Sequence, residues 1–373
     1  MIPSPIRAAP LTTMLLADVV NRRDNNLDAL RLIAASLVIV DHAFPIAGRS
    51  HFANGVLGFT LGNLAVSAFF AMSGYLIAKS WVDDPDLVRF TAKRVLRLMP
   101  ALIVAALFGA LVIGALTTSL PIGEYLRNPA TRSFITHNSA VFPIQYSLPG
   151  VFQANPYPAA VNGSLWSLPI EVMAYGIVLV LGFAGLLRRR TWVFAVFLAV
   201  LYVHLRLPSS RFLGKGVWFY MPVVQMWELF AMFLMGTLAY LYRDRIVLSP
   251  TLAAGMLAVM AVTLKTSMAP AVYLVTVPYV LLVIGYSTLP WLRRLTTPGD
   301  VSYGIYIYAF PVQQTLAHLR PGTNPWLAAA AALPITYGLA FASWRIVEKP
   351  ALKLKKLLPG ARRQPAASLA GGV

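Results

Sequence analysis

The chain has no cysteine among its 373 residues, which excludes disulfide bonds and a cysteine nucleophile. Charged residues are also scarce, at 12% of the sequence, whereas a soluble domain has roughly 25%. Acids are the rarer sign, with 13 against 31 lysines and arginines, and the net charge is +18. No HExxH, P-loop or metal-ligand spacing occurs, so we expect no metal site.

Long apolar runs are what the chain has in abundance, and hydrophobic residues make up 58% of it. Such runs predict an all-α integral membrane protein, a bundle of about ten transmembrane helices. We find no internal repeat and no clear signal-peptide cleavage site. The expected spans lie near residues 27–46, 57–79, 95–117, 165–187, 191–207, 217–241, 250–267, 270–289, 301–319 and 324–346.

The cations lie mostly in alternate segments between these runs, such as 89–97 and 188–190. Cytoplasmic loops of membrane proteins carry an excess of lysine and arginine, so this bias predicts that both termini are cytoplasmic. An anionic membrane face explains the net charge without nucleic acid, and we expect no nucleic-acid partner.

The spans divide the chain into three parts. Residues 1–26 are expected to be a cytoplasmic tail, 27–350 the transmembrane domain and 351–373 a basic cytoplasmic tail. The long segment 118–164 then lies outside. Its prolines and aromatic residues favour a packed cap over a floppy linker.

The first span carries Arg31, Asp41 and His42, although ionised groups inside a bilayer are costly and normally face a site. Arg31 and His42 fall on one helix face, about 16 Å apart. His42 is either a histidine bonded between helices or a general base that takes a proton from a hydroxyl. Asp41 points about 100° away and is expected to contact a loop.

A group of cations opens the third span, and it includes Lys93, Arg94 and Arg97. Arg94 and Arg97 share a helix face. By themselves they are ordinary anchors at the membrane surface. With Arg31 entering from the same side, they form a candidate phosphate-binding cluster, since arginine suits phosphate groups.

Two carboxylates lie inside expected spans. Glu171 is near the outer end of the fourth span, where it either pairs with a cation or orients His42 or an acceptor hydroxyl. Glu228 lies deeper and is expected to be structural. Small residues around Gly74 favour close helix packing, and nothing in the sequence places a base beside Ser73 as a nucleophile. Arg345 and Glu348 are spaced for a local ion pair.

Several segments together resemble the membrane-bound acyltransferase 3 family, which O-acylates sugars and related acceptors. They are DALRLIAASLVIVDHAF, AFFAMSGYLI, RFTAKRVLRLMPA, SLWSLPIEVMAY, VSYGIYIYAFPV and VEKP, in the order of the family. The resemblance covers most of residues 28–350. It implies a ten-helix core that uses acyl-CoA from the cytoplasm.

The resemblance also implies roles for particular residues. It assigns the essential arginine and histidine to Arg31 and His42, the paired arginines to Arg94 and Arg97, and the carboxylate of the SLW segment to Glu171. The family often has a histidine where this chain has Ala309, so any role of that histidine is absent or replaced. Without a fused esterase-like domain, the chain resembles the stand-alone type that acts on envelope or exported carbohydrates.

These lines together predict a multi-pass O-acyltransferase of the cell inner membrane. Its partners would be membrane lipid, acyl-CoA as the cosubstrate and a carbohydrate or glycolipid acceptor. His42, Glu171 and Arg31 are the expected catalytic residues, and Arg94, Arg97 and Lys93 the expected cofactor-binding residues. Acetyl-CoA is the commonest donor of the family, with succinyl or longer chains as alternatives. Direct transfer and an acyl-enzyme route both remain open, and a glycan or lipid transporter is the rival class.

Overall fold

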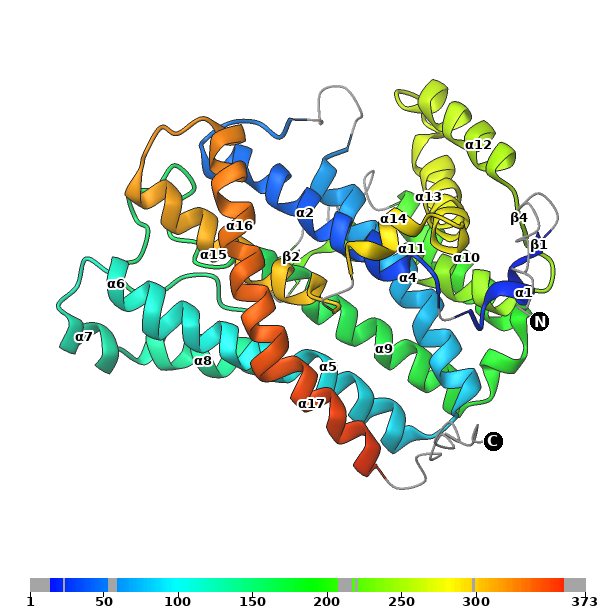
Figure 1. The fold of residues 1–373 in the computed structure, drawn as a ribbon, viewed down its shortest axis with the longest axis horizontal. Coiled ribbons are helices and arrows are strands. Elements are labelled where there is room, and N and C mark those ends of the chain that lie inside the picture. The colour runs from blue at the N-terminus through cyan, green and yellow to red at the C-terminus, as the bar shows by residue number, and fades with distance from the viewer. Residues whose placement is uncertain are drawn as a thin grey trace, which may run out of the picture.

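The computed structural model describes residues 14–22, 24–52, 59–206, 217–218, 221–296 and 299–358, and helices dominate it (Figure 1). The helices are α1 (Leu16–Val19), α2 (Leu27–Ile46), α4 (Leu61–Asp83), α5 (Leu87–Leu107), α6 (Ala115–Thr117), α7 (Ile122–Arg127), α8 (Pro129–Ala140), α9 (Ser167–Phe183), α10 (Arg190–Arg206), α11 (Val223–Leu241), α12 (Pro250–Thr263), α13 (Ala269–Tyr286), α14 (Pro290–Arg294), α15 (Ser302–Leu319), α16 (Pro325–Ser343) and α17 (Lys349–Lys353).

Short turns and strands connect these helices. π-Helical turns occur at Phe108–Gly114 and Trp344–Glu348, and 3₁₀ turns at Gly163–Trp166, Leu186–Arg188 and Leu354–Leu357. Strand β1 (Met14–Leu15) pairs antiparallel with β4 (Val247–Leu248), and β2 (Val217–Trp218) pairs with β3 (Met221–Pro222).

A helix coincides with each range expected from the apolar runs, which confirms an all-α membrane protein. Seven helical segments of the described chain are long and apolar enough to cross a bilayer: 27–46, 61–83, 87–117, 163–183, 223–241, 269–286 and 325–357. Helix α12 has only 14 residues, about 21 Å, which is short of a hydrocarbon core of about 30 Å. The expected number of about ten crossings therefore stays a prediction.

Helix α4 lies in the middle of the bundle, packed along α11 and α2. Gly74 and Gly236 make the approach to α11 possible, because a Cβ atom on Gly74 would overlap the carbonyl oxygen of Phe233. Helix α15 packs against the other side of α2, and α16 packs against both. The small residues near Gly74 therefore serve helix packing, as expected.

The segment 118–164 is packed and contains α7 and α8, which the sequence analysis did not predict. Tyr125, Phe134 and Phe152 are almost fully buried in a small apolar cluster with the end of the preceding span. In Figure 1 this part lies at the opposite side of the molecule from the α12–α13 hairpin. The helical periodicity of these residues is hard to recognise in the sequence, because the helices are short and are separated by prolines and turns.

The two expected tails are only partly covered by the described residues. Leu16 and Val19 of α1 are fully buried in the main apolar cluster. The described part of the segment before residue 27 is therefore packed against the bundle. Residues 1–13 and 359–373 lie outside the described residues. We call the end of the bundle at His42 the histidine end, and the end at Arg31 and Arg97 the arginine end.

Candidate functional site

At the arginine end, one carboxylate joins two arginines. Arg31 Nη1 lies 3.3 Å and Arg97 Nη2 lies 2.5 Å from Asp300 Oδ2. Ser302 Oγ donates to the other carboxylate oxygen at 2.5 Å. Burial by itself would raise the pKa of Asp300, but Arg97 and then Arg31 outweigh it and hold the pKa at about 2. Arg31 and Arg97 are therefore held together by an ionised partner.

Arg97 has a second buried partner in Glu348, whose Oε2 is 3.5 Å away. Glu348 sits at the end of a π-helical turn and also accepts a hydrogen bond from Ser343 at 3.2 Å. The expected local pair of Arg345 with Glu348 is therefore wrong. Arg345 lies over the ring of Phe341 instead, 5.0 Å from its centroid, because the π-helical turn changes the direction of the side chains.

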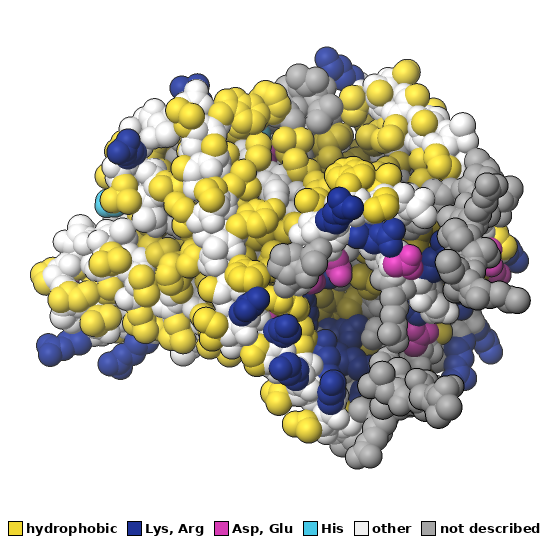
Figure 2. All heavy atoms as spheres, viewed as in Figure 1, with side chains coloured by type: hydrophobic (Ala, Val, Ile, Leu, Met, Phe, Trp, Pro, Cys, Tyr) yellow, Lys and Arg dark blue, Asp and Glu magenta, His cyan; other side chains and the backbone are white. Residues whose placement is uncertain are grey.

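The two other expected phosphate-binding residues lie further out. Arg94 stacks on Phe90, 4.3 Å from the ring centroid, and Lys93 pairs with Asp84 at 2.7 Å. Figure 2 shows lysine and arginine side chains gathered around a hollow beside the lower ends of α5 and α17. The arginine end thus presents a cationic surface outside the half-buried pair of Arg31 and Arg97.

Above this pair lies the inner cavity, lined by Arg31, Val66, Phe69, Phe70, Arg97, Leu98, Ser167, Leu168, Glu171, Tyr175, Ser302, Tyr303 and Tyr306. Glu171 accepts hydrogen bonds from Tyr175 and, at 3.5 Å, from Ser73. Among the described residues it makes no hydrogen bond to His42, and it lines the arginine side of the path. Glu171 therefore does not orient His42 in this geometry. It does lie beside Ser73, for which the sequence indicated no neighbouring base.

At the histidine end lies the outer cavity, lined by Val38, Asp41, His42, Pro45, His51, Thr60, Gly62, Asn63, Val66, Tyr157, Gly163, Trp166, Pro222, Gln225, Tyr306 and Phe310. His42 contacts Phe310 edge to face at 5.4 Å between ring centroids. Its Nδ1 atom is buried and has no hydrogen-bond partner in the described part of the chain. An unpaired buried nitrogen raises the free energy of the folded protein. A hydrogen bond from a substrate hydroxyl would remove this cost.

The sequence analysis missed a second histidine in the outer cavity. The His51 Nδ1 atom lies 2.8 Å from Asp41 Oδ2, so Asp41 contacts the loop after α2, as expected. The hydrogen bond to Asp41 raises the pKa of His51, and burial opposes it. Gly62 leaves room for this pair, because a Cβ atom there would lie 2.6 Å from Asp41 Oδ2.

The two cavities adjoin, since Val66 and Tyr306 line both. The hydroxyl of Tyr306 is fixed, 2.7 Å from both the Ser164 carbonyl oxygen and Ser167 Oγ. Arg31 thus lines the inner cavity and His42 lines the adjoining outer cavity, on the same side of α2, as their helical spacing predicts.

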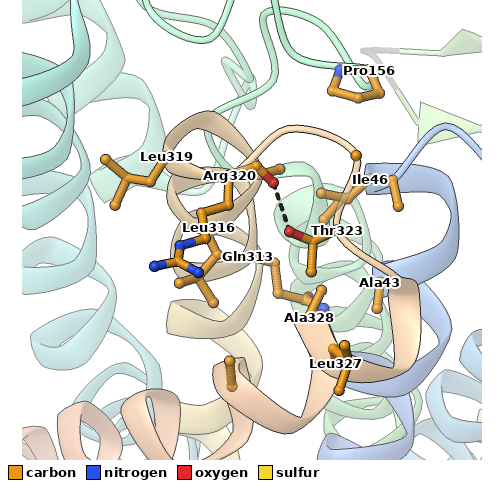
Figure 3. Close-up of a pocket in the computed structure, with 14 residues that line it drawn as sticks. Ala43, Ile46, Pro156, Gln313, Leu316, Leu319, Arg320, Thr323, Leu327 and Ala328 are labelled. Carbon is orange, nitrogen blue, oxygen red and sulfur yellow. Dashed lines mark hydrogen bonds between the residues drawn. The ribbon is translucent and has the colours of Figure 1, made fainter.

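A separate cavity between α2, α15 and α16 is almost wholly apolar (Figure 3). Its polar groups are Gln313, which donates to the Ile39 carbonyl oxygen at 2.7 Å, and Thr323 and Arg320 at the rim. None of the described residues that line it is a carboxylate or an imidazole. This cavity is therefore not where acid–base chemistry takes place.

The remaining expectations concern Ala309 and metals. Ala309 is fully buried and packs in a cluster with Ile39 of α2. The histidine of the resembled family is therefore replaced here by helix packing. The described residues contain no group of histidines and carboxylates able to hold a metal ion.

Comparison with known proteins decides the family. The model of the acyltransferase 3 family, described as an acyltransferase domain, matches residues 24–345. This chain belongs to the acyltransferase 3 family. An O-acetyl transferase of Shigella phage Sf6 is 30% identical over 339 residues, which cover 88% of this chain and 96% of that protein. Nodulation protein 10 of Rhizobium leguminosarum bv. viciae is 27% identical over 357 residues, covering 91% of this chain and 96% of that protein.

No solved structure matches the chain. The family and the relatives make this acyltransferase 3 protein an O-acyltransferase, and its apolar helices make it a multi-pass membrane enzyme. The sequence analysis missed Asp300 and His51, which now stand beside the expected residues. The position of Asp300, directly before the resembled segment VSYGIYIYAFPV, could have indicated this residue. Nothing in the sequence pointed to His51.

Proposed function

We propose that this enzyme moves an acetyl group from acetyl-CoA to a hydroxyl of a cell-envelope or exported carbohydrate. The observation that carries the proposal is His42, whose buried Nδ1 lacks a partner among the described residues while the side chain lines the outer cavity. The printed name of the phage relative, an O-acetyl transferase, supports acetyl as the group.

We place the donor at the arginine end. The phosphates of CoA would lie against Arg94, with Lys93 at the rim, where the cationic hollow of Figure 2 opens. The pantetheine arm would then run through the inner cavity past Arg97 and Glu171. The shared walls Val66 and Tyr306 support this path, because they connect the inner cavity to the outer one.

The transfer itself would take place beside His42. The imidazole accepts the proton of the acceptor hydroxyl as the oxygen attacks the thioester carbon. The C–O bond forms, the C–S bond breaks, and the proton passes from the imidazolium to the leaving thiolate. Arg31, fixed by its pair with Asp300, would line the donor side of the inner cavity. Glu171 would contact the pantetheine arm in the same cavity.

The charge bias supports the orientation. Segments at the arginine end carry most of the lysines and arginines, which favours a cytoplasmic arginine end where acyl-CoA is made. The histidine end would then receive the acceptor from outside, and the protein would lie in the cell inner membrane.

The test is transfer of labelled acetyl from acetyl-CoA to envelope glycans in membranes that contain the wild type or His42→Ala. We expect a loss of about 10²- to 10⁴-fold at equal protein level, the usual value of a general base. His318→Ala is the matched control, since His318 lies away from both cavities, 5.7 Å from the ring of Phe152. Full transfer by His42→Ala would make His42 structural and overturn the mechanism.

A further inference from the structure

A second polar cavity lies at the histidine end, outside the site described above. It is lined by Phe59, Asn63, His204, Glu228, Met260, Leu264, Ala269, Pro270, Tyr273 and Leu274, from α4, α10, α11 and the α12–α13 hairpin. In Figure 1 this hairpin forms the corner of the molecule away from α7 and α8. We call this space the lateral cavity.

Its polar groups are buried or half-buried and poorly satisfied. His204 is 8% and Tyr273 is 7% exposed. Neither His204 Nδ1 nor the Tyr273 hydroxyl has a hydrogen-bond partner in the described part of the chain. The third group, Glu228, accepts only a long hydrogen bond, 3.5 Å from Ser67 Oγ.

Each unpaired buried polar atom costs about 1–3 kcal/mol. The unpaired atoms of His204 and Tyr273, and the weakly bonded Glu228 beside them, therefore need a reason. They come from three different helices and converge on the same space, which local packing does not require. The expectation that Glu228 is merely structural does not account for its neighbours. A ligand that fills the lateral cavity with hydrogen-bonding groups does.

The lateral cavity adjoins the outer cavity, because Asn63 lines both. Asn63 stands in the first turn of α4, whose N-cap Thr60 accepts a hydrogen bond from its backbone nitrogen at 2.9 Å. Thr60 itself lines the outer cavity. A ligand in the lateral cavity would therefore reach into the space where His42 lies.

The chemistry of the walls selects the ligand. No lysine or arginine is among the described residues that line the lateral cavity, so it offers no cation to an anionic ligand. A carboxylate, an imidazole, a phenol and an amide together supply donors and acceptors for hydroxyl groups. The rings of Phe59 and Tyr273, 5.1 Å apart between centroids, add aromatic walls that suit the C–H face of a sugar.

We propose that the lateral cavity binds a neutral sugar unit of the acceptor, next to the unit whose hydroxyl is acylated at His42. This inference rests on the proposed function, since it assigns a subsite to the same acceptor. The lateral cavity and the inner cavity share no lining residue among the described residues. The lateral cavity is therefore assigned to the acceptor and not to the donor.

The absence of cysteine from the chain allows a clean test. Leu264→Cys places one thiol on the wall of the lateral cavity, and Ser267→Cys places one on the exposed turn nearby as the matched control. Each variant is treated in membranes with a small methanethiosulfonate reagent. The probe ligand is the oligosaccharide released from the envelope polysaccharide of the expressing cells.

We expect the oligosaccharide to slow modification of Leu264→Cys at least about 3-fold, and to leave Ser267→Cys unchanged. Acetyl-CoA should protect neither thiol. The same protection should persist when His42→Ala is added, because binding in the lateral cavity does not need the base. Equal labelling rates with and without the oligosaccharide at Leu264→Cys would overturn the subsite, whatever the activity.

A second variant measures the hydrogen bond. Tyr273→Phe removes a hydroxyl that forms no well-aligned hydrogen bond and interacts only weakly with Ser67, so we expect little effect on folding. We expect the acceptor KM to rise about 2- to 10-fold, the value of one hydrogen bond, with an unchanged donor KM. Tyr279→Phe is the control on the same helix, since the Tyr279 hydroxyl bonds the Val247 carbonyl oxygen at 2.8 Å, away from the lateral cavity.

The two proposals fail separately. Normal acetyl transfer with an unchanged acceptor KM in Tyr273→Phe would remove the lateral subsite and leave the proposed function intact. Full transfer by His42→Ala, with protection of Leu264→Cys preserved, would remove the histidine mechanism and leave the sugar subsite intact.

Discussion

The arginine end and the histidine end both place polar groups inside a membrane protein, but they satisfy them differently. Arg97 has a carboxylate partner at 2.5 Å in Asp300 and a second at 3.5 Å in Glu348. At the histidine end, His42 Nδ1 and His204 Nδ1 have no partner among the described residues. The two arginines of one end thus have ionic partners, whereas these two imidazole nitrogens have none.

The difference follows from the cost of burial. A charge largely withdrawn from water costs several kcal/mol without a partner, so Arg31 and Arg97 keep Asp300 as a permanent counter-ion. A neutral imidazole or phenol left unpaired costs about 1–3 kcal/mol, which a fold can tolerate until a substrate supplies the bond. In the proposed mechanism, the arginine end would be organised before the donor arrives, and the acceptor would complete the histidine end.

The largest expected effect comes from removing the shared counter-ion. Asp300→Asn keeps the shape but leaves Arg31 and Arg97 facing each other, and we expect a loss of about 2–4 kcal/mol in stability. Thermal unfolding of the purified protein in detergent measures it. Asp84→Asn, at a surface ion pair, is the control. An unchanged stability in Asp300→Asn would mean that the arginines need no permanent partner.

The next effect separates the ends by kinetics. Arg94→Ala removes the cation that we place against the CoA phosphates, and we expect the KM for acetyl-CoA to rise about 10- to 100-fold, as for a lost charged hydrogen bond. The acceptor KM should not change. Arg345→Ala is the control, because Arg345 stacks on Phe341 and lines neither cavity of the site. A change in the acceptor KM alone would reverse the assignment of the two ends.

A smaller effect concerns the one charge-assisted pair described at the histidine end. Gly62→Ala brings a Cβ atom to 2.6 Å from Asp41 Oδ2 and should separate Asp41 from His51. The pKa of His51 is raised by that bond, so its stabilisation is fully present below about pH 6.5 and is lost as pH rises through the raised pKa.

We therefore expect Gly62→Ala to cost about 0.5–1 kcal/mol at pH 5 and less at pH 9, since His51 is partly exposed. NMR titration of His51 and thermal unfolding at both pH values measure this. Gly176→Ala is the control, because a Cβ atom at Gly176 would meet no atom within 4 Å. An equal loss at both pH values would point to steric strain alone.

The smallest effect tests the outer rim of the arginine end. Arg89, and then Lys93, lower the pKa of Asp84 to about 2. A lowered carboxyl pKa stabilises the fold above about pH 4 and ceases to do so as pH falls to about 2. Because the pair is partly exposed, we expect about 0.5 kcal/mol, reduced further by salt. Unfolding of Asp84→Asn between pH 2 and 5 checks it, with Asp24→Asn, in another exposed ion pair, as the control.

Much of the fold could be predicted because its signals are local. A run of apolar residues forms a helix in a membrane whatever its neighbours are, since each helix satisfies its own backbone. The 3.6-residue period alone put Arg31 and His42 on one face of α2, and they do line two adjoining cavities, one residue in each. The helices in 118–164 escaped prediction because α7 has only 6 residues and α8 only 12.

The partners of the site residues could not be predicted in the same way. Asp300 lies 269 residues after Arg31 in the sequence, and no spacing rule connects them. Glu171 was expected beside His42 because both belong to the outer half of the bundle, but its turn of α9 faces the inner cavity. The lateral cavity is assembled from separate helices, none of which carries a motif by itself.

The sequence by itself determined a membrane-spanning helical enzyme of the acyltransferase 3 family, because apolar runs and ordered motifs are written along the chain. Only the tertiary structure decided which carboxylate holds the arginines, which histidine stands unpaired and which cavities meet. The physical reason is that pairing of buried groups depends on distances between helices, and these are set by packing such as that of α4 against α11.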